Sequence, residues 1–189
     1  PVELPLSALY ADGTLTLSSR AEMETWMRWR STGRSLGVTR EVVRIVVCGD
    51  VTEIPDGAFE DCPLLESVLL ANGVARVGEK AFRRAPRLTS VSLPDTVRAI
   101  GAEAFRYTGL VELALPEGLE TVGAHAFSGL PALTRVTLPD SLTRLEETFC
   151  DCPVLQEASL GGGLSCLEEG MFDSCPLLTE LTVPAGVTE

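Results

Sequence analysis

Several residue types are scarce in this chain of 189 residues, and each scarcity argues against a class of function. Basic residues number 15 against 27 acidic ones, which gives a net charge of −12. Because proteins that bind nucleic acids need a basic face, we expect no nucleic-acid partner. No apolar run approaches the ~18 residues of a transmembrane helix, so we expect no membrane insertion. Only 5% of the residues are aromatic, although 45% are hydrophobic.

The few phenylalanines that are present recur at a fixed period of 22 or 23 residues. Aliphatic residues keep the same phase: one precedes each Phe, one follows it, and a V-x-L pair such as Val91 and Leu93 closes the unit. A period in this range is typical of a solenoid. The six phenylalanines are Phe59, Phe82, Phe105, Phe127, Phe149 and Phe172.

Each repeat is interpreted as one coil. The V-x-L alternation predicts a short strand with one face inward. A proline such as Pro94 ends it, because proline cannot donate a backbone hydrogen bond. Segments such as Gly57-Ala58-Phe59 predict tight helical turns on the opposite wall, with Phe filling the volume between the walls. We therefore expect an α/β solenoid with parallel strands ~4.8 Å apart and every repeat Phe nearly fully buried.

Two units carry a resemblance to a known family: I-P-D-G-A-F-E-D-C-P-L-L-E-S-V-L-L at 54–70 and V-G-A-H-A-F-S-G-L-P-A-L-T-R-V-T-L-P at 122–139. They resemble the BspA-like class of leucine-rich repeat, named for a bacterial surface antigen, over residues 45 to 187. The resemblance implies a right-handed superhelix with a parallel β-sheet on one face. It also implies a secreted or cell-surface protein that binds other proteins and lacks enzymatic activity. The family occurs in protists and algae too, which leaves an intracellular or organellar location open.

The chain divides into a capping region, residues 1–44, and about six repeats, residues 45–189. Within the capping region, Asp12-Gly13 predicts a hairpin turn. Ser19 with Glu22 three residues later predicts the start of a helix. This helix carries both tryptophans, Trp26 and Trp29, and we expect it to cover the first coil.

No polar cap follows the last repeat. An open solenoid edge invites unwanted strand pairing. We therefore expect further repeats or a partner subunit to cover this edge, and the chain to be a fragment if further repeats do so.

The cysteines are predicted to be mainly packing residues. Cys62, Cys152 and Cys175 each lie three residues after a repeat Phe, at a small inward position where a free thiol packs as a hydrophobe. A disulfide between Cys152 and Cys175 is the alternative, because adjacent coils bring them close enough. A zinc site that also used Cys150 and Cys166 is disfavoured, since the spacing matches no zinc finger or ribbon.

Motifs that would support catalysis are missing. The chain has no G-x-S-x-G elbow or G-K-[ST] loop, and its single histidine excludes H-E-x-x-H. That histidine, His125, is predicted to be a solvated turn residue. Gly161-Gly162-Gly163 replaces the strand-ending turn of other repeats, so we interpret it as structural. We expect no enzymatic activity, catalytic residue, metal or cofactor.

The remaining candidate site is a surface. In each predicted strand, the residues on either side of the central aliphatic point away from the core and form a ribbon that we expect to contact a protein partner. The cluster Arg83, Arg84, Arg87 and Arg106 on the opposite wall is a weaker candidate for an acidic partner. The ribbon comprises Ser67, Leu69, Ser90, Ser92, Glu112, Ala114, Arg135, Thr137, Glu157, Ser159, Glu180 and Thr182.

Two functions fit these features. The first is a non-catalytic interaction module of a cell-surface or secreted protein that mediates adhesion or partner binding. The alternative is a structural or scaffold subunit docked in a larger assembly, which can be intracellular or organellar. The open last coil and the unpaired cysteines favour the alternative, whereas the family resemblance favours the first.

Overall fold

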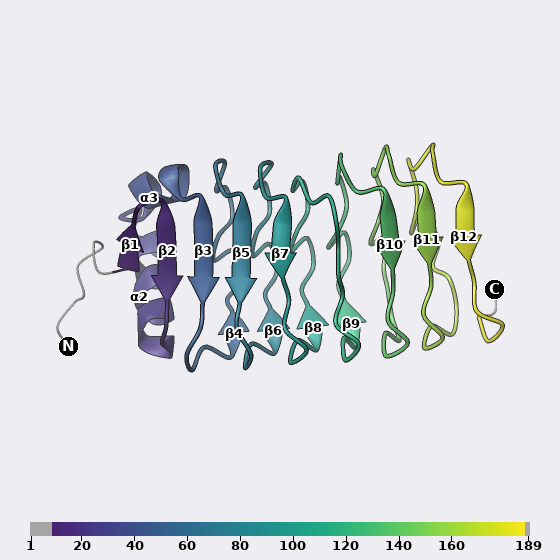
Figure 1. Ribbon diagram of the computed structural model, residues 1–189, viewed down its shortest axis with the longest axis horizontal. Coiled ribbons are helices and arrows are strands. Elements are labelled where there is room, and N and C mark those ends of the chain that lie inside the picture. Colours follow the sequence, from purple (N-terminus) through teal and green to yellow (C-terminus); the bar gives the residue numbers. More distant parts are fainter. Residues whose placement is uncertain (1–8, 188–189) are drawn as a thin grey trace.

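The chain folds into an elongated stack of coils in which strands of successive repeats lie side by side along the long axis (Figure 1). This computed structural model describes residues 9–187. Residues 1–8 of the predicted capping region and residues 188–189 of the predicted repeat region lie outside the described residues. Within residues 9–187, no helix is both long and apolar enough to cross a membrane.

The predicted V-x-L strands form the main wall of the stack. A five-stranded sheet begins with an antiparallel hairpin and continues in parallel, with Val68 in register with Val91. A separate three-stranded parallel sheet continues the main wall, with Val136 in register with Ala158. The strands in order are β1 (Tyr10–Ala11), β2 (Thr14–Leu17), β3 (Arg44–Val47), β5 (Ser67–Leu70) and β7 (Ser90–Ser92), then β10 (Arg135–Thr137), β11 (Glu157–Ser159) and β12 (Glu180–Thr182).

One predicted strand is wrong. The segment 112–114 has no strand geometry, and the main wall is interrupted between β7 and β10 (Figure 1). The loop from Phe105 to Leu110 is one residue shorter than the equivalent loop of the other repeats. A lost residue pulls the following segment out of register with its neighbours. At this place the backbone is linked to the preceding coil by a long hydrogen bond of 3.4 Å, from Val111 N–H to the carbonyl oxygen of Thr89.

A four-stranded parallel sheet, which we call the second sheet and which the sequence did not predict, runs along another edge of the coils. Its strands pair in chain order, with Val77 in register with Ile100. A single bridge from Thr121 to Arg144 extends the pairing by one coil. Each strand contains the aliphatic residue that precedes the repeat Phe. They are β4 (Glu53–Ile54), β6 (Arg76–Val77), β8 (Ala99–Ile100) and β9 (Thr121–Val122).

The wall around the repeat phenylalanines, which we call the turn wall, contains turns where the sequence predicted helical turns. Within a coil, Arg83 N–H donates to the carbonyl oxygen of Lys80, three residues back, at 3.2 Å. Between coils, Phe82 N–H donates to the carbonyl oxygen of Ala104 at 2.8 Å. These intercoil bonds recur along the wall and hold successive turns in fixed register.

Left-handed backbone conformations produce this geometry. Positive φ values occur two residues before and two residues after every repeat Phe, for example 55° at Lys80 and 59° at Arg84. Branched side chains resist this conformation, and neither position carries a β-branched residue in any repeat. The residues before Phe are Gly57, Lys80, Glu103, His125, Glu147 and Gly170, and those after it are Asp61, Arg84, Tyr107, Gly129, Asp151 and Ser174.

The repeat phenylalanines form a continuous stack through the core. Neighbouring rings lie 5.2 to 6.0 Å apart between centroids, with planes 8° to 21° from parallel, the geometry of offset stacking. The first five are fully buried, as predicted. Phe172 is only partly buried, contrary to the prediction, because its ring packs on Phe149 on one side and no described coil covers the other.

The predicted hairpin and helix lie at the amino-terminal end. Helix α2 (Arg20–Ser31) begins with the Ser19 hydroxyl accepting a hydrogen bond from Glu22 N–H at 3.2 Å. The Glu22 carboxylate accepts from the backbone N–H of Ser18, so the reciprocal bond lies one residue earlier than in a capping box. The Trp26 ring stacks on Phe59 with centroids 5.9 Å apart and thereby extends the phenylalanine stack by one ring at its amino-terminal end. A second helix, α3 (Leu36–Glu41), leads into β3.

Candidate functional site

The predicted ribbon lies on the outer side of the main wall, which we call the strand face. Nine of its residues are exposed, and Ser67, Glu157 and Ser159 are half-buried. The side chain between them is buried in four of the six coils, as Val68 and Val136 show at no more than 2% exposure, whereas Val91 is half-buried and Leu181 in the last described coil is 42% exposed. The alternation that the sequence predicted is therefore confirmed except in β12, where all three residues are exposed, and it extends across the segment 112–114 that is not a strand.

The charges of the strand face are partly satisfied by one another. The Arg135 guanidinium binds the Glu157 carboxylate on the neighbouring strand through two contacts, of 2.5 and 2.8 Å. Glu157 is also in register with Glu180 on the next strand. With Glu112, the ribbon thus carries three carboxylates and one guanidinium. The ribbon is acidic and its one cation is already paired, whereas the exposed Arg44 on β3, in register with Ser67, adds a second cation to the strand face.

A hollow lies where the main wall is interrupted. Its volume is about 360 Å³, and it lies between β7 and the segment that follows Gly109. The Val111 side chain is 47% exposed there and provides an apolar contact. Val111 and Thr89 were not among the predicted site residues, although the one-residue deletion before Leu110 in the sequence marks the irregularity. The lining residues are Thr89, Ser90, Val91, Val111, Glu112 and Ala114.

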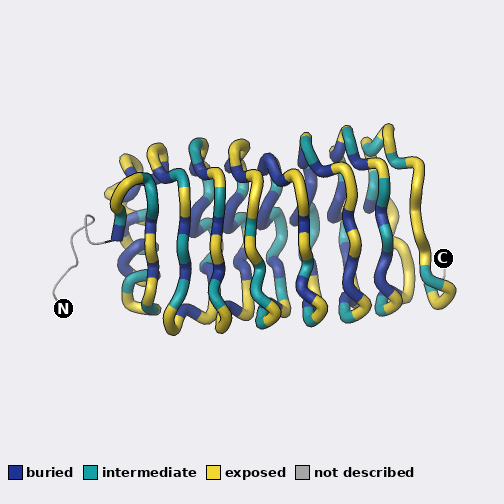
Figure 2. The backbone as a smooth tube through the Cα atoms, in the orientation of Figure 1, coloured by how far each residue is buried: buried dark blue, intermediate teal, exposed yellow. Residues whose placement is uncertain are grey.

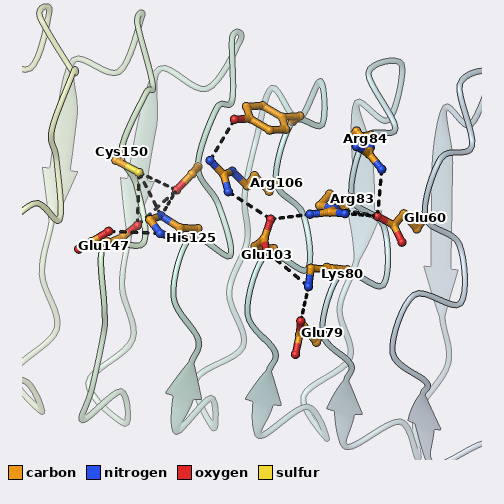
Figure 3. A network of polar contacts seen from close by, with 12 residues as sticks. Glu60, Glu79, Lys80, Arg83, Arg84, Glu103, Arg106, His125, Glu147 and Cys150 are labelled. Atoms are coloured by element: carbon orange, nitrogen blue, oxygen red, sulfur yellow. Dashed lines mark hydrogen bonds and ion pairs between the residues drawn. The ribbon is translucent and has the colours of Figure 1, made fainter.

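The arginine cluster on the turn wall is not a free basic patch, which corrects the sequence interpretation. Arg83 lies between two carboxylates of neighbouring coils, with its Nε 2.7 Å from Glu60 and its Nη1 2.8 Å from Glu103 (Figure 3). Arg84 binds both oxygens of Asp61, at 2.7 and 3.1 Å. Arg106 donates to Glu103 at 3.1 Å. Arg83 and Arg84 thus link neighbouring coils and Arg106 is paired within its own coil, so these three cations already have acidic partners; Arg87 is exposed.

Glu103 is the centre of this network. Burial disfavours its charged form, but hydrogen bonds from Arg83 and Arg106 outweigh burial and lower the pKa of the carboxyl group. Lys80 adds an ion pair at 3.7 Å from the preceding coil. Glu103 thus joins two successive coils, and Arg83 extends the network to a third through Glu60, which makes a structural role the simplest explanation of the cluster.

His125 is a turn residue, as predicted, but it is not simply solvated. Its Nε2 lies 3.2 Å from the Glu147 carboxylate, and its Nδ1 lies 3.4 Å from the Cys150 sulfur (Figure 3). The Ser128 hydroxyl lies 2.9 Å from the same sulfur. The cluster is at the surface, since 31% of the His125 side chain and 57% of the Glu147 side chain are exposed.

The cysteines are all free. Cys62 and Cys152 are buried, as predicted, and burial raises the pKa of each thiol to about 12. Cys152 and Cys175 form no disulfide. Cys175 is only half-buried, because it belongs to the last described coil. Among residues 9–187, no group of three or more histidine, cysteine or acidic side chains is arranged to hold a metal ion.

The triple glycine has the structural role that was predicted. A Cβ atom at Gly161 would lie 2.2 Å from the carbonyl oxygen of Pro139, and one at Gly163 would lie 2.1 Å from that of Asp140. Gly162 N–H donates to the Asp140 carboxylate at 2.8 Å. The missing side chains thus allow the turn to pack against the preceding coil.

Comparisons with known proteins agree with this architecture. The model of the BspA type leucine-rich repeat region matches in six copies, over residues 39–145 and 75–189. The chain therefore belongs to the BspA-type leucine-rich repeat family. A search of curated proteins gives no match.

Solved structures of bacterial leucine-rich repeat proteins have the same fold. A Treponema pallidum leucine-rich repeat protein is 29% identical and has a TM-score of 0.69. The alignment covers 76% of this chain and 72% of the Treponema protein. A leucine-rich repeat protein from Bacteroides ovatus is 32% identical and has a TM-score of 0.74. The alignment covers 78% of this chain and 39% of the Bacteroides protein. The pneumococcal vaccine antigen PcpA, which is 19% identical, shares only the fold with this chain. Its TM-score is 0.63, and the alignment covers 78% of this chain and 40% of PcpA.

Proposed function

We propose that the chain is a non-catalytic protein-interaction module whose strand face contacts a protein partner. The observation that carries the proposal is the hollow of about 360 Å³ at the interruption of the main wall. It combines an exposed apolar side chain, Val111, with exposed polar groups such as Ser90. A concave surface with an apolar centre and a polar rim suits protein recognition.

The charge of the strand face indicates the chemistry of the partner. Within the ribbon Arg135 is paired with Glu157, so Glu112 and Glu180 are the carboxylates that remain to meet an approaching protein. The chain as a whole carries a net charge of −12. Opposite charges accelerate encounter and fix orientation. We therefore propose a partner with a basic contact surface.

A cell-surface or secreted location, with a role in adhesion, is the second part of the proposal. The BspA-type family supports it. The pneumococcal protein of the same fold is a vaccine antigen, which also favours exposure at a surface. The competing proposal is a scaffold subunit of a larger assembly, which can be intracellular or organellar.

The last described coil supports the competing proposal. Most of this coil is exposed (Figure 2), and its apolar side chains include Leu177 at 48% and Val183 at 42% exposure. Exposed apolar side chains grouped on one edge mark a contact surface. We propose that a further repeat of the same kind or a partner subunit covers this edge. Size-exclusion chromatography with light scattering separates the two functions: a stable monomer weakens the scaffold proposal, and aggregation relieved by a co-purifying subunit supports it.

Site-specific photo-crosslinking tests the strand face. We would place p-benzoylphenylalanine at Ser92 or Thr137 on the strand face, and at Thr121 on the second sheet as the matched exposed control. The labelled protein is irradiated with surface extracts of its source cells and with extracellular proteins of their environment. The proposal predicts one protein, with a basic contact segment, crosslinked from both strand-face positions and not from Thr121. Crosslinks from Thr121 alone would contradict it.

A further inference from the structure

The cluster of His125, Ser128, Glu147 and Cys150 is assembled from two successive coils. His125 and Glu147 both lie two residues before their repeat Phe, and Ser128 and Cys150 both lie one residue after it. The supporting rings, Phe127 and Phe149, are fully buried and stack with centroids 5.5 Å apart. The intercoil hydrogen bond from Gly129 N–H to the Cys150 carbonyl oxygen, 3.0 Å long, fixes the register. The ring stack and this bond fix how the two coils face each other, although the segment from Leu145 to Phe149, which carries Glu147, is one residue shorter than in the other repeats.

The contacts define the tautomer of the imidazole. The Glu147 carboxylate can only accept a hydrogen bond, so the histidine nitrogen 3.2 Å from it, Nε2, carries the proton. Nδ1 is then the acceptor, and it lies 3.4 Å from the Cys150 sulfur. When Nδ1 takes up a second proton, Nε2 keeps its contact with the Glu147 carboxylate, 3.2 Å away. A thiol, an imidazole and a carboxylate in this order form the arrangement that activates cysteine nucleophiles.

Other groups also contact the sulfur and limit its geometry. The Cys150 thiol lies 3.5 Å from the Glu147 carbonyl oxygen, a second acceptor for its proton. The Ser128 hydroxyl lies 2.9 Å from the sulfur, 3.5 Å from His125 Nδ1, and within 3.4 Å of the carbonyl oxygens of Glu147 and Thr148. When the thiol loses its proton, this hydroxyl can turn to donate to the thiolate.

We propose that Cys150 is a modification site that reacts with small, soft carbon electrophiles, with His125 as the base that removes the thiol proton. The cluster lies on the outer turn wall and not in a deep cleft, so stoichiometric modification fits it better than turnover. With iodoacetamide, a bond forms between the Cys150 sulfur and the methylene carbon, and the carbon–iodine bond breaks. Iodide leaves, and the thiol proton passes to His125 Nδ1 and then to water.

The chain contains its own control thiols. Cys166 is exposed, whereas Cys150 is half-buried. If access alone decided the rate, Cys166 would react first. Cys62 and Cys152 are buried thiols whose pKa is raised to about 12. Their alkylation therefore reports loss of the fold.

The test follows alkylation of each cysteine by iodoacetamide at pH 7 with peptide mass spectrometry. We expect Cys150 to react at least ~10-fold faster than Cys166, a modest part of what a positioned base supplies. In His125→Gly, the Cys150 rate should fall to that of Cys166 or below. Glycine adopts the positive φ of 57° at this position without strain, so the turn is preserved.

Added imidazole separates the chemical role from a structural one. In His125→Gly, imidazole should restore a large part of the Cys150 rate and leave the Cys166 rate unchanged. Protection of Cys62 and Cys152 shows that the variant is folded. The proposal is overturned if Cys166 reacts faster than Cys150 in the wild type. It is also overturned if the folded variant alkylates Cys150 at the wild-type rate, or if imidazole changes both thiols equally.

Discussion

Phe82 and Phe105 are separated by 23 residues in the chain, yet their ring centroids lie 5.2 Å apart and their planes differ by 13°. Both side chains are fully buried. The backbone repeats the relationship, because Phe82 N–H donates to Ala104 O at 2.8 Å. Ring stacking and the intercoil hydrogen bonds thus have the same register. Each coil contributes one ring to a core that no coil completes alone.

Replacing Phe105 by Ala should destabilise the protein by about 3–5 kcal/mol, because it opens a cavity between two rings that cannot collapse onto each other. Urea unfolding followed by circular dichroism measures the change. Phe172→Ala is the matched control, since this ring is only partly buried and stacks on one side alone. Its cost should be less than half that of Phe105→Ala. Equal costs would show that stacking on both sides does not stabilise the coils.

The spacing of the phenylalanines predicted the solenoid, the V-x-L alternation predicted the inward faces of the strands, and the helical pattern that follows Ser19 predicted Trp26 over the first coil. These features follow from apolar periodicity, which the sequence displays directly. The second sheet and the turn wall were missed because backbone hydrogen bonds between coils leave little trace in side-chain type. The absence of β-branched residues at the positions of Lys80 and Arg84 was the available signal for positive φ.

Gly101→Ala should destabilise the protein by about 1–3 kcal/mol, the range of overpacking changes. A Cβ atom at this position would lie 2.5 Å from the backbone nitrogen of Glu79 in the preceding coil. Thermal unfolding measures the effect. Gly37→Ala in helix α3 is the control, because a Cβ atom there has no neighbour within 4 Å, and it should leave stability unchanged or raise it slightly. A loss of stability in both variants would refute the packing argument.

Lowering the pH should reduce the free energy of unfolding, because Glu103 on the turn wall becomes protonated. Hydrogen bonds from Arg83 and Arg106 outweigh burial and hold the pKa of this carboxyl below its ordinary value of 4.5. A lowered folded-state pKa stabilises the protein fully above pH 4.5, and this stabilisation is lost as the pH falls through the folded-state pKa. In urea unfolding, the stability difference between wild type and Glu103→Gln should therefore narrow from pH 7 to pH 3. Glu168→Gln, at an exposed turn residue, controls for the loss of a carboxylate. A difference that stays constant would contradict the assignment.

The buried thiols should be inert in the folded protein. Burial raises the pKa of Cys62 and Cys152 to about 12, so both are protonated at pH 8 and shielded from reagents. With Ellman's reagent at pH 8, the exposed Cys166 should react within minutes, and these two only after unfolding in guanidinium. Rapid reaction of Cys62 in the native protein would show that the coil around Phe59 opens.

The candidate site was predicted only in part. The outward residues of the strand face follow from strand alternation, so Ser92 and Thr137 could be placed in advance. The association of His125 with Glu147 and Cys150 was not predicted, because it depends on which positions of adjacent coils face each other across the turn wall. Aligning the repeats on their phenylalanines places His125 and Glu147 in one column, and that alignment was the signal for their contact.

The most direct test of the proposed function is isothermal titration of the crosslinked partner, once purified, against two arginine variants. Ala114→Arg adds a cation to the acidic strand face, and Thr121→Arg adds the same charge on the second sheet; both wild-type residues are exposed. The proposal predicts that Ala114→Arg weakens binding by at least ~10-fold, about 1.4 kcal/mol, and that Thr121→Arg binds like the wild type. Unchanged affinity in Ala114→Arg, or equal losses in both variants, would contradict binding through the strand face.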